Sequence, residues 1–335
     1  MRFFERQQTA RAQTRQLLLL FGLILLALVL AINTALALTW KVVGGGSDYP
    51  VYFFCVNTGL TLLFVFGGWW LEAAVLASGG EKLARRAGAR EAWPASRKDE
   101  TRLCNIVSEL AIAASMKPPQ AMVLARVEGI NAFAAGWDED DAVIAVTRGA
   151  LEKLTRDELQ GLVAHELSHL REGDTRLNMR LSGMVFGLEM IFNLGQRMCE
   201  ARDDGHRSLL ALPGVAVMAC GALGWLGGRI LKAAVSRQRE FLADARAVQF
   251  TRSKEGLGGM LRKVMGEQAS RSAPQGVAAG QRLSPLLHHM LLVGPQAESN
   301  WLATHPPLAE RVRRIYGRTM PPVEPVLEGR APAAF

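Results

Sequence analysis

The sequence predicts an α+β protein, mainly α-helical and integral to a membrane, with four transmembrane helices and a small β-sheet. Three observations support this fold class: two long uncharged segments near the N-terminus, a hydrophobic content of 49%, and short β-prone segments in the middle of the chain. We expect a first domain over residues 1–78, formed by an N-terminal tail and a transmembrane hairpin. Residues 79–335 are expected to form a second domain, into which another transmembrane hairpin is inserted.

Each of the two N-terminal segments is long enough to cross a bilayer. Residues 17–39 and 51–71 contain no charged residue, and we expect the second span to continue to about residue 74. A hydrocarbon core of about 30 Å needs about 20 helical residues. A cleaved signal peptide is the alternative for the first segment, because Ala35-Leu36-Ala37 resembles a cleavage site. The length of its apolar run and the second span that follows favour an uncleaved anchor.

The basic residues near these spans predict their orientation. The loop between the spans contains Lys41 and Asp48 as its charged residues. Many more basic residues lie outside the hairpin, on both of its flanks: Arg2, Arg6, Arg11, Arg15, Lys82, Arg85, Arg86 and Arg90. By the positive-inside rule, both flanks are expected in the cytoplasm and the loop on the other side.

Charge and cysteine content also exclude several classes of function. The net charge of +8 is largely a topology signal, and no interleaving of aromatic and basic residues indicates nucleic-acid binding. The four cysteines are far apart and form no C-x-x-C pair. We therefore expect neither a disulfide framework nor a thiolate metal site.

The middle of the chain changes from helical to β periodicity. Residues 99–115 have apolar side chains at helical spacing, and Pro118 and Pro119 follow them. Three short β-prone segments come next, separated by turn-forming residues: 121–127, 131–135 and 142–147. We expect them to form a small sheet beside the helix that follows.

That helix, predicted over residues 155–173, contains an H-E-x-x-H motif at residues 165–169. Thr155 and Glu158 predict a capping box at its start. His165 and His169 are four residues apart, so both imidazoles can bind one metal ion from the same helix face. Glu166 lies beside them, where it can take a proton from a water that the metal activates. A surface helix with two incidental histidines is the alternative.

A second apolar region follows the motif. Residues 181–195 are a weak candidate span, because Glu189 and Asn193 interrupt them, whereas residues 208–228 are an uncharged and better one. We expect a transmembrane hairpin at about residues 181–231 that begins and ends on the cytoplasmic side. A pair of buried core helices is the alternative.

After this region, Glu240 and Asp244 are spaced to share a helix face. Glu240 can complete a site of two histidines and one glutamate, the ligand set of many catalytic zinc sites. Asp244 is then placed to hold a ligating histidine through its other ring nitrogen. A solvated, charged helix face is the alternative, but it would leave the H-E-x-x-H motif without a third ligand.

Four blocks of sequence resemble the HtpX family of membrane-embedded zinc endopeptidases, which are relatives of the CAAX prenyl endopeptidases. The blocks are N-A-F-A-A-G at residues 131–136, H-E-L-S-H with G-D-T at 165–175, S-R-Q-R-E-F-L-A-D at 236–244, and T-H-P-P-L-A-E-R at 304–311. The resemblance implies a zincin-type catalytic domain. It also implies that His305 stabilises an oxyanion and that Arg311 lies beside it. A further implication is an edge strand that binds peptides, formed by Asn131, Ala132, Phe133 and Ala134.

Together these features predict a zinc-dependent endopeptidase with one zinc ion per chain. We expect a multi-pass protein of the cell inner membrane, in contact with the lipid bilayer, whose catalytic site faces the cytoplasm. The resemblance implies polypeptide substrates, in particular misfolded or damaged membrane proteins. From the charge distribution we expect no nucleic-acid partner. A specific processing endopeptidase of the CAAX prenyl type is one alternative. A non-catalytic membrane chaperone or scaffold, stabilised by zinc, is the other.

Overall fold

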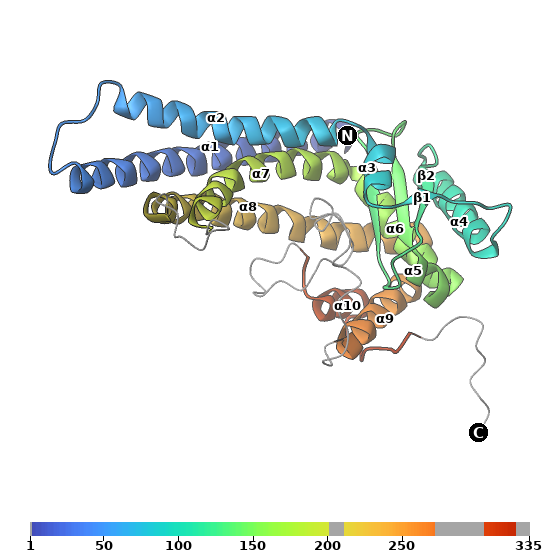
Figure 1. Cartoon of the computed structure of the whole chain (residues 1–335). Helices are drawn as coiled ribbons and strands as arrows, with labels where there is room; N and C mark the ends of the chain where they lie inside the picture. Colours follow the sequence, from blue (N-terminus) through green and yellow to red (C-terminus); the bar gives the residue numbers. More distant parts are fainter. Residues whose placement is uncertain (1, 201–210, 272–304, 326–335) are drawn as a thin grey trace. The chain divides into compact units, whose positions relative to one another are not determined.

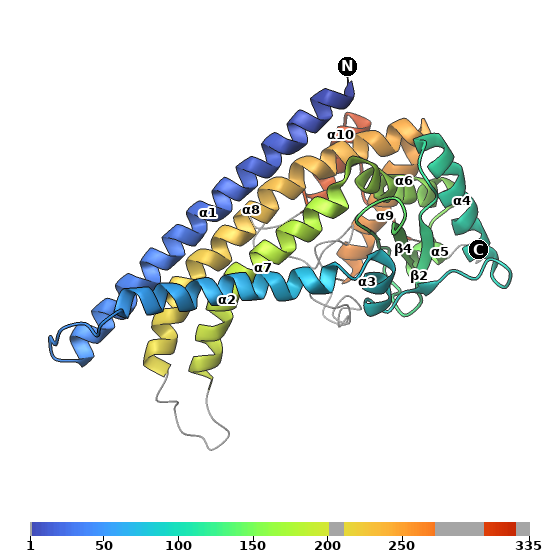
Figure 2. The same ribbon diagram turned by 90° about the horizontal axis from the view of Figure 1, so that it is seen from above.

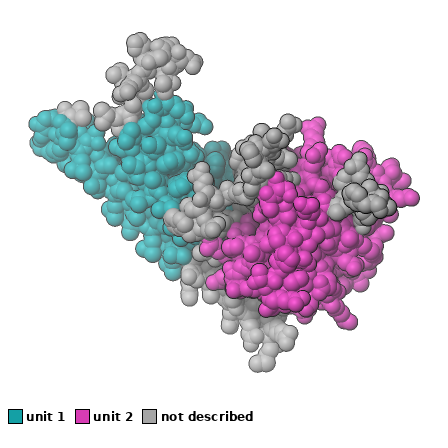
Figure 3. Space-filling view, turned by 90° about the horizontal axis from the view of Figure 1, so that it is seen from below, with its two compact units in different colours: residues 1–75, 179–232 teal, residues 76–178, 233–335 magenta. Residues whose placement is uncertain are grey.

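The computed structural model describes residues 2–200, 211–271 and 305–325 of the chain (Figure 1). The chain forms two compact units, shown in different colours in Figure 3. Unit 1 comprises residues 1–75 and 179–232, and unit 2 comprises residues 76–178 and 233–335. Each unit therefore combines two segments that are far apart in the sequence.

Unit 1 is built from long helices. It contains nearly all of α1 (Arg2–Val43) and α2 (Phe53–Leu76), together with parts of α7 (Asp174–Cys199) and α8 (Ala211–Thr251). In the described part of the chain, three helical segments are long and apolar enough to cross a membrane: Leu18–Val42, Phe53–Leu76 and Gly214–Thr251. Both predicted N-terminal spans are among them, so the expectation of a membrane protein is confirmed.

The prediction of four transmembrane helices is wrong in its number, because α7 is not among these segments. The helix is long enough, with 26 residues. However, Glu189, Asn193 and Arg197 interrupt its apolar residues and lower its mean hydropathy. The other predicted arm of this hairpin lies within α8, although residues 208–210 are outside the described residues.

Close contacts between helix backbones explain how α7 packs in unit 1. A side chain at Gly187 would lie 2.3 Å from the carbonyl oxygen of Val65 in α2, and one at Gly221 of α8 would lie 2.5 Å from the Phe192 nitrogen in α7. Small residues allow membrane helices to approach in this way. Buried apolar residues from three helices fill the interior: Phe21, Leu28, Ile32, Val65, Met184, Leu188 and Ile191.

Unit 2 contains a mixed sheet of four short strands. They are β1 (Arg90–Glu91), β2 (Gln120–Leu124), β3 (Ala132–Ala135) and β4 (Val143–Thr147), in the order β1-β2-β4-β3. The β2–β4 pair is parallel and the other two pairs are antiparallel. Three of these strands confirm the predicted sheet, whereas β1 has only two residues and no periodicity that could predict it. β3 is the terminal strand beside β4.

Unit 2 also contains six shorter helices: α3 (Gly80–Arg86), α4 (Lys98–Ala114), α5 (Arg148–Lys153), α6 (Arg156–Glu172), α9 (Glu255–Arg271) and α10 (Leu308–Tyr316). Figure 2 shows α4, α6 and α9 gathered in this unit, and α6 packs against α4, α9 and strand β3. Leu162, Val163 and Leu167 of α6 are fully buried in the core that results. The helix with the H-E-x-x-H motif therefore lies at the centre of unit 2.

Candidate metal centre

Helix α6 places both predicted histidine ligands on one side. The predicted capping box is present, since Thr155 accepts from the Glu158 nitrogen and Glu158 accepts from the Thr155 nitrogen. Gly173 ends the helix in the left-handed conformation, with φ 73°. His165 is fully buried and His169 is partly buried, and their Nε2 atoms lie 3.2 Å apart.

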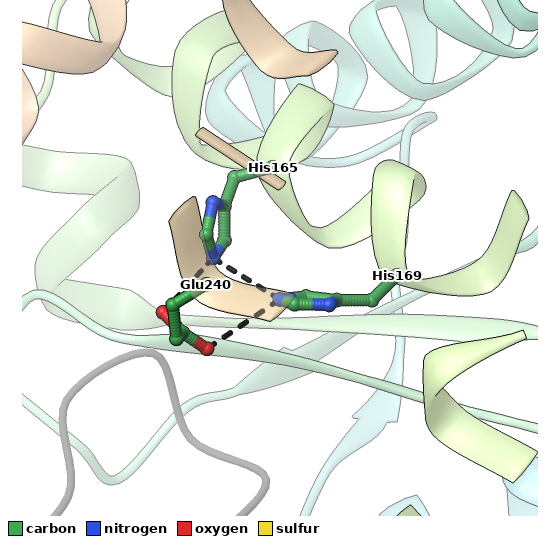
Figure 4. A group of neighbouring side chains, drawn as sticks. All are labelled: His165, His169 and Glu240. Carbon is green, nitrogen blue, oxygen red and sulfur yellow. Dashed lines mark hydrogen bonds and ion pairs between the residues drawn. The ribbon is translucent and has the colours of Figure 1, made fainter. Parts of the chain in front are cut away.

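Glu240 of α8 completes a cluster with these two histidines (Figure 4). Its Oε2 atom lies 3.6 Å from His165 Nε2, and its Oε1 atom lies 3.6 Å from His169 Nε2. One ligand atom from each residue lies within 4.8 Å of the others. Two ligands of a tetrahedral zinc ion, each about 2.0–2.1 Å from it, lie about 3.3 Å apart. The spacing and the donor types therefore fit a zinc ion.

Each histidine is oriented by a separate carboxylate at its other ring nitrogen. His165 Nδ1 lies 3.0 Å from Asp244 Oδ1, and His169 Nδ1 lies 2.9 Å from Asp174 Oδ2. If each carboxylate accepts the Nδ1 proton, each Nε2 presents a lone pair to the centre of the cluster. Burial lowers the pKa of His165, with Asp244 acting in the opposite direction, and this favours the neutral imidazole that a metal requires.

Asp174 is a residue for which the sequence analysis predicted no role. It begins α7 directly after Gly173, where the chain leaves the motif helix and turns back toward His169. It also forms an ion pair with Arg239 of α8. The available signal was the acidic residue immediately after the helix-ending glycine, five positions from His169.

Arg311 of α10 connects the acidic residues of the site. It is fully buried, donates to both carboxylate oxygens of Asp244 at 2.8 and 2.7 Å, and has its Nη1 atom 3.0 Å from Glu240 Oε2. Burial alone would lower the pKa of Arg311, but Asp244 and Glu240 outweigh it and raise the pKa above its usual value. The guanidinium therefore remains charged and holds both carboxylates in place.

Glu166 follows His165 in the motif, beside the candidate metal ligands, and is also buried, with 2% of its surface exposed. Burial raises the pKa of Glu166 to about 7, although the Ala134 main-chain N–H donates to its carboxylate and acts in the opposite direction. A pKa near neutrality suits a group that accepts a proton in one step and returns it in another. A bound cation favours the ionised form.

The structure also brings His305 to this cluster. Its Nδ1 atom lies 3.2 Å from Glu240 Oε1, and 16% of its side chain is exposed. Its Nε2 atom is buried and has no hydrogen-bond partner among the described residues. His305 therefore has a ring nitrogen that could bind a substrate oxygen. Thr304, which begins this block of sequence, lies outside the described residues.

The four residues predicted to bind a peptide lie on or beside the terminal strand. Ala132, Phe133 and Ala134 belong to β3, and Asn131 immediately precedes it. The contact between Ala134 and Glu166 places this strand directly beside the cluster. Unit 2 thus combines candidate metal ligands, a buried acid and a terminal strand in one place.

Comparisons with known proteins agree with this arrangement. Residues 97–319 match the model of peptidase family M48. A protease HtpX homolog of Ligilactobacillus salivarius is 28% identical over 319 residues, which cover 92% of this chain and 98% of that protein. A protease HtpX homolog of Thermoanaerobacter pseudethanolicus is 33% identical over 240 residues, 68% of this chain and 76% of that protein. One of Caldanaerobacter subterraneus subsp. tengcongensis is 34% identical over 229 residues, 65% of this chain and 72% of that protein.

Proposed function

The chain belongs to peptidase family M48 as an HtpX-like zinc metallopeptidase, and from this premise we propose that it degrades misfolded or damaged membrane proteins at the cell inner membrane. One observation supports the proposal above all. Unit 2 places a cluster of His165, His169 and Glu240 beside a buried glutamate and a terminal strand. A strand that adds to β3 is held through its main chain, so an enzyme of this kind can bind unfolded segments of many sequences.

In this proposal His165, His169 and Glu240 hold one zinc ion per chain. When bound, zinc supplies a Lewis acid that polarises the scissile carbonyl and activates water. Glu166 accepts the proton of the attacking water and later delivers it to the leaving amine, a double role that its pKa of about 7 suits. His305 donates from Nε2 to the oxyanion that forms.

The residues around these groups keep them in position. Asp244 and Asp174 hold the two histidines, and Arg311 holds Asp244 and Glu240. Ala132 and Ala134 supply main-chain groups to the substrate strand. The basic flanks of the first two spans favour a cytoplasmic location for unit 2.

The test is turnover by Glu166→Gln, which removes the proton acceptor but leaves the three ligands. Purified with its membrane helices in detergent, the variant should retain one zinc ion per chain and lose at least about 10²-fold in casein cleavage. Glu109→Gln is the matched control, since Glu109 is half-exposed and lies on α4 in an ion pair with Arg156. In cells, a misfolded membrane protein should accumulate with Glu166→Gln and be degraded with the control.

Full turnover by Glu166→Gln at verified zinc occupancy would overturn the assignment of the base. Cleavage of casein combined with unchanged levels of misfolded membrane proteins would support the peptidase but refute quality control. A scaffold that keeps zinc for structure alone predicts that Glu166→Gln preserves the cellular function and that loss of a ligand abolishes it.

A further inference from the structure

The hydrogen-bonding pattern of β3 shows which of its main-chain groups face away from β4. The Thr147 nitrogen of β4 donates to the Asn131 carbonyl at 3.1 Å, and the register pairs Phe133 with Ala145 and Ala135 with Val143. In an antiparallel ladder, alternate residues direct both main-chain groups to the partner strand. The main-chain groups of Ala132 and Ala134 therefore face away from β4, where a substrate strand would add.

The two N–H groups on that side already have acceptors in this structure. Asn131 Oδ1 accepts from the Ala132 nitrogen at 3.0 Å, and the Glu166 carboxylate accepts from the Ala134 nitrogen. The carbonyl groups of Ala132 and Ala134 are directed to the same side, away from β4. The hydrogen bond to Glu166 also places Ala134 beside the group that takes part in the reaction.

Strand β3 ends at Ala135, just before Gly136, which is the next residue whose main-chain groups would face away from β4. Two residues in the first turn of α7 bind the carbonyl groups at this end. The Thr175 hydroxyl donates to the Gly136 carbonyl at 3.0 Å, and Arg176 Nε donates to the Trp137 carbonyl at 2.6 Å. Thr175 is buried, with 5% of its surface exposed. Gly136 has φ 141°, and a side chain there would lie 2.8 Å from Ala142 Cα, so the chain bends away where a longer strand would continue.

We propose that Thr175 limits the length of the substrate strand by occupying the Gly136 carbonyl. This inference rests on the proposed peptidase function. A substrate that adds antiparallel to β3, the pairing that is more stable per residue, has its N-terminal part directed toward Gly136. The segment on the amino side of the scissile bond then makes its last main-chain hydrogen bond at Ala134. Thr175 acts as a specificity-determining residue and takes no part in the chemical step.

The experiment compares peptides that have one scissile bond and increasing length on its amino side. For the wild type, kcat/KM should stop rising once the residue that pairs with Ala134 is present. In Thr175→Ala the hydroxyl is absent and space opens at the Gly136 carbonyl. Further lengthening should then raise kcat/KM by about 2- to 10-fold, the effect of one net hydrogen bond. Thr175→Ser keeps the hydroxyl and should behave as the wild type.

A second measurement needs no variant, and so decides the question even if Thr175→Ala does not fold. Methylation of the substrate nitrogen that pairs with Ala134 should reduce wild-type kcat/KM by about 2- to 10-fold, whereas methylation of the nitrogen two residues further toward the substrate N-terminus, which would pair with Gly136, should have no effect. Equal losses at both nitrogens, or the same length dependence in Thr175→Ala and Thr175→Ser, would overturn the inference. Absence of cleavage by the zinc-loaded wild type would instead refute the proposed function.

Discussion

Single residues hold the two histidines of the site from different directions. Asp244 reaches His165 from α8 and is itself fixed by Arg311, whereas Asp174 reaches His169 from the start of α7 and pairs with Arg239. The two histidines therefore depend on separate carboxylates. A change at one carboxylate should weaken one ligand and leave the other in place.

Asp174→Asn tests this dependence at His169. The amide replaces an anionic acceptor by a neutral one, so His169 becomes a weaker and less well-oriented ligand. We expect zinc affinity to fall about 10- to 100-fold, as measured by competition with a chelator. Asp140→Asn is the control, because Asp140 is exposed and pairs with Lys117 at the surface. Equal zinc affinity in the two variants would remove Asp174 from the support of the site.

Glu100 should make the stability of unit 2 sensitive to acid. Its side chain is 1% exposed, and it accepts from Arg90 at 2.5 Å and from the Trp93 nitrogen at 2.6 Å. The hydrogen bond from Arg90 lowers the pKa of Glu100, against the effect of burial. A folded-state pKa below the unfolded one gives stability that is present above about pH 4.3 and is lost as the pH falls through the folded value.

We therefore expect Glu100→Gln to cost about 1–3 kcal/mol of unfolding free energy at pH 7, because Arg90 loses a charged partner. The difference from the wild type should shrink as the pH falls through the lowered pKa of Glu100 in the folded protein, because protonation then removes the charge that the wild type carries. Denaturant unfolding of the two proteins in detergent, from pH 7 into the acid range, measures it. A difference that does not change with pH would show that the ionised carboxylate is not the source of the stability.

At the scale of elements, short sequence patterns predicted those helix ends and strands that depend mainly on neighbouring residues. The capping box of α6, its glycine stop and three of the four strands were all visible as short patterns. Strand β1 was not, because two residues have no periodicity and it forms only by pairing with β2. The sequence analysis counted α7 among the transmembrane helices, but α7 is not apolar enough to be a candidate span. Its packing in unit 1 depends on close contact with α2 and α8, which no local pattern predicts.

The site shows the same division between local and long-range information. The H-E-x-x-H spacing and the separation of Glu240 from Asp244 fix which side chains share a helix face, so the sequence could predict these groupings. The partner of His169 could not be predicted in this way. Asp174 follows a left-handed glycine, and only the turn of the chain there directs it back to the histidine. The contact of Thr175 with Gly136 depends on the same turn.

At the scale of the whole molecule, the division into units restricts the topology. Unit 2 contains residues on both sides of the segment 179–232, and its site uses His165 from one side and Glu240 from the other. We propose that unit 2 lies on one side of the membrane, so that the chain returns by residue 233 to the side that it left after residue 178.

Reporter fusions test this restriction together with the orientation. The basic flanks of the first two spans predict that a reporter fused after Arg90 lies in the cytoplasm, and that one inserted in the loop after Lys41 lies outside. A reporter fused after Tyr316, at the end of α10, should match the one at Arg90, because Arg311 of the same helix contacts Asp244 within unit 2. A cytoplasmic reporter at Arg90 with an outside reporter at Tyr316 would mean that unit 2 cannot assemble as a single body. The reverse pattern at all three positions would leave unit 2 intact but place its site outside, away from cytoplasmic segments of damaged membrane proteins.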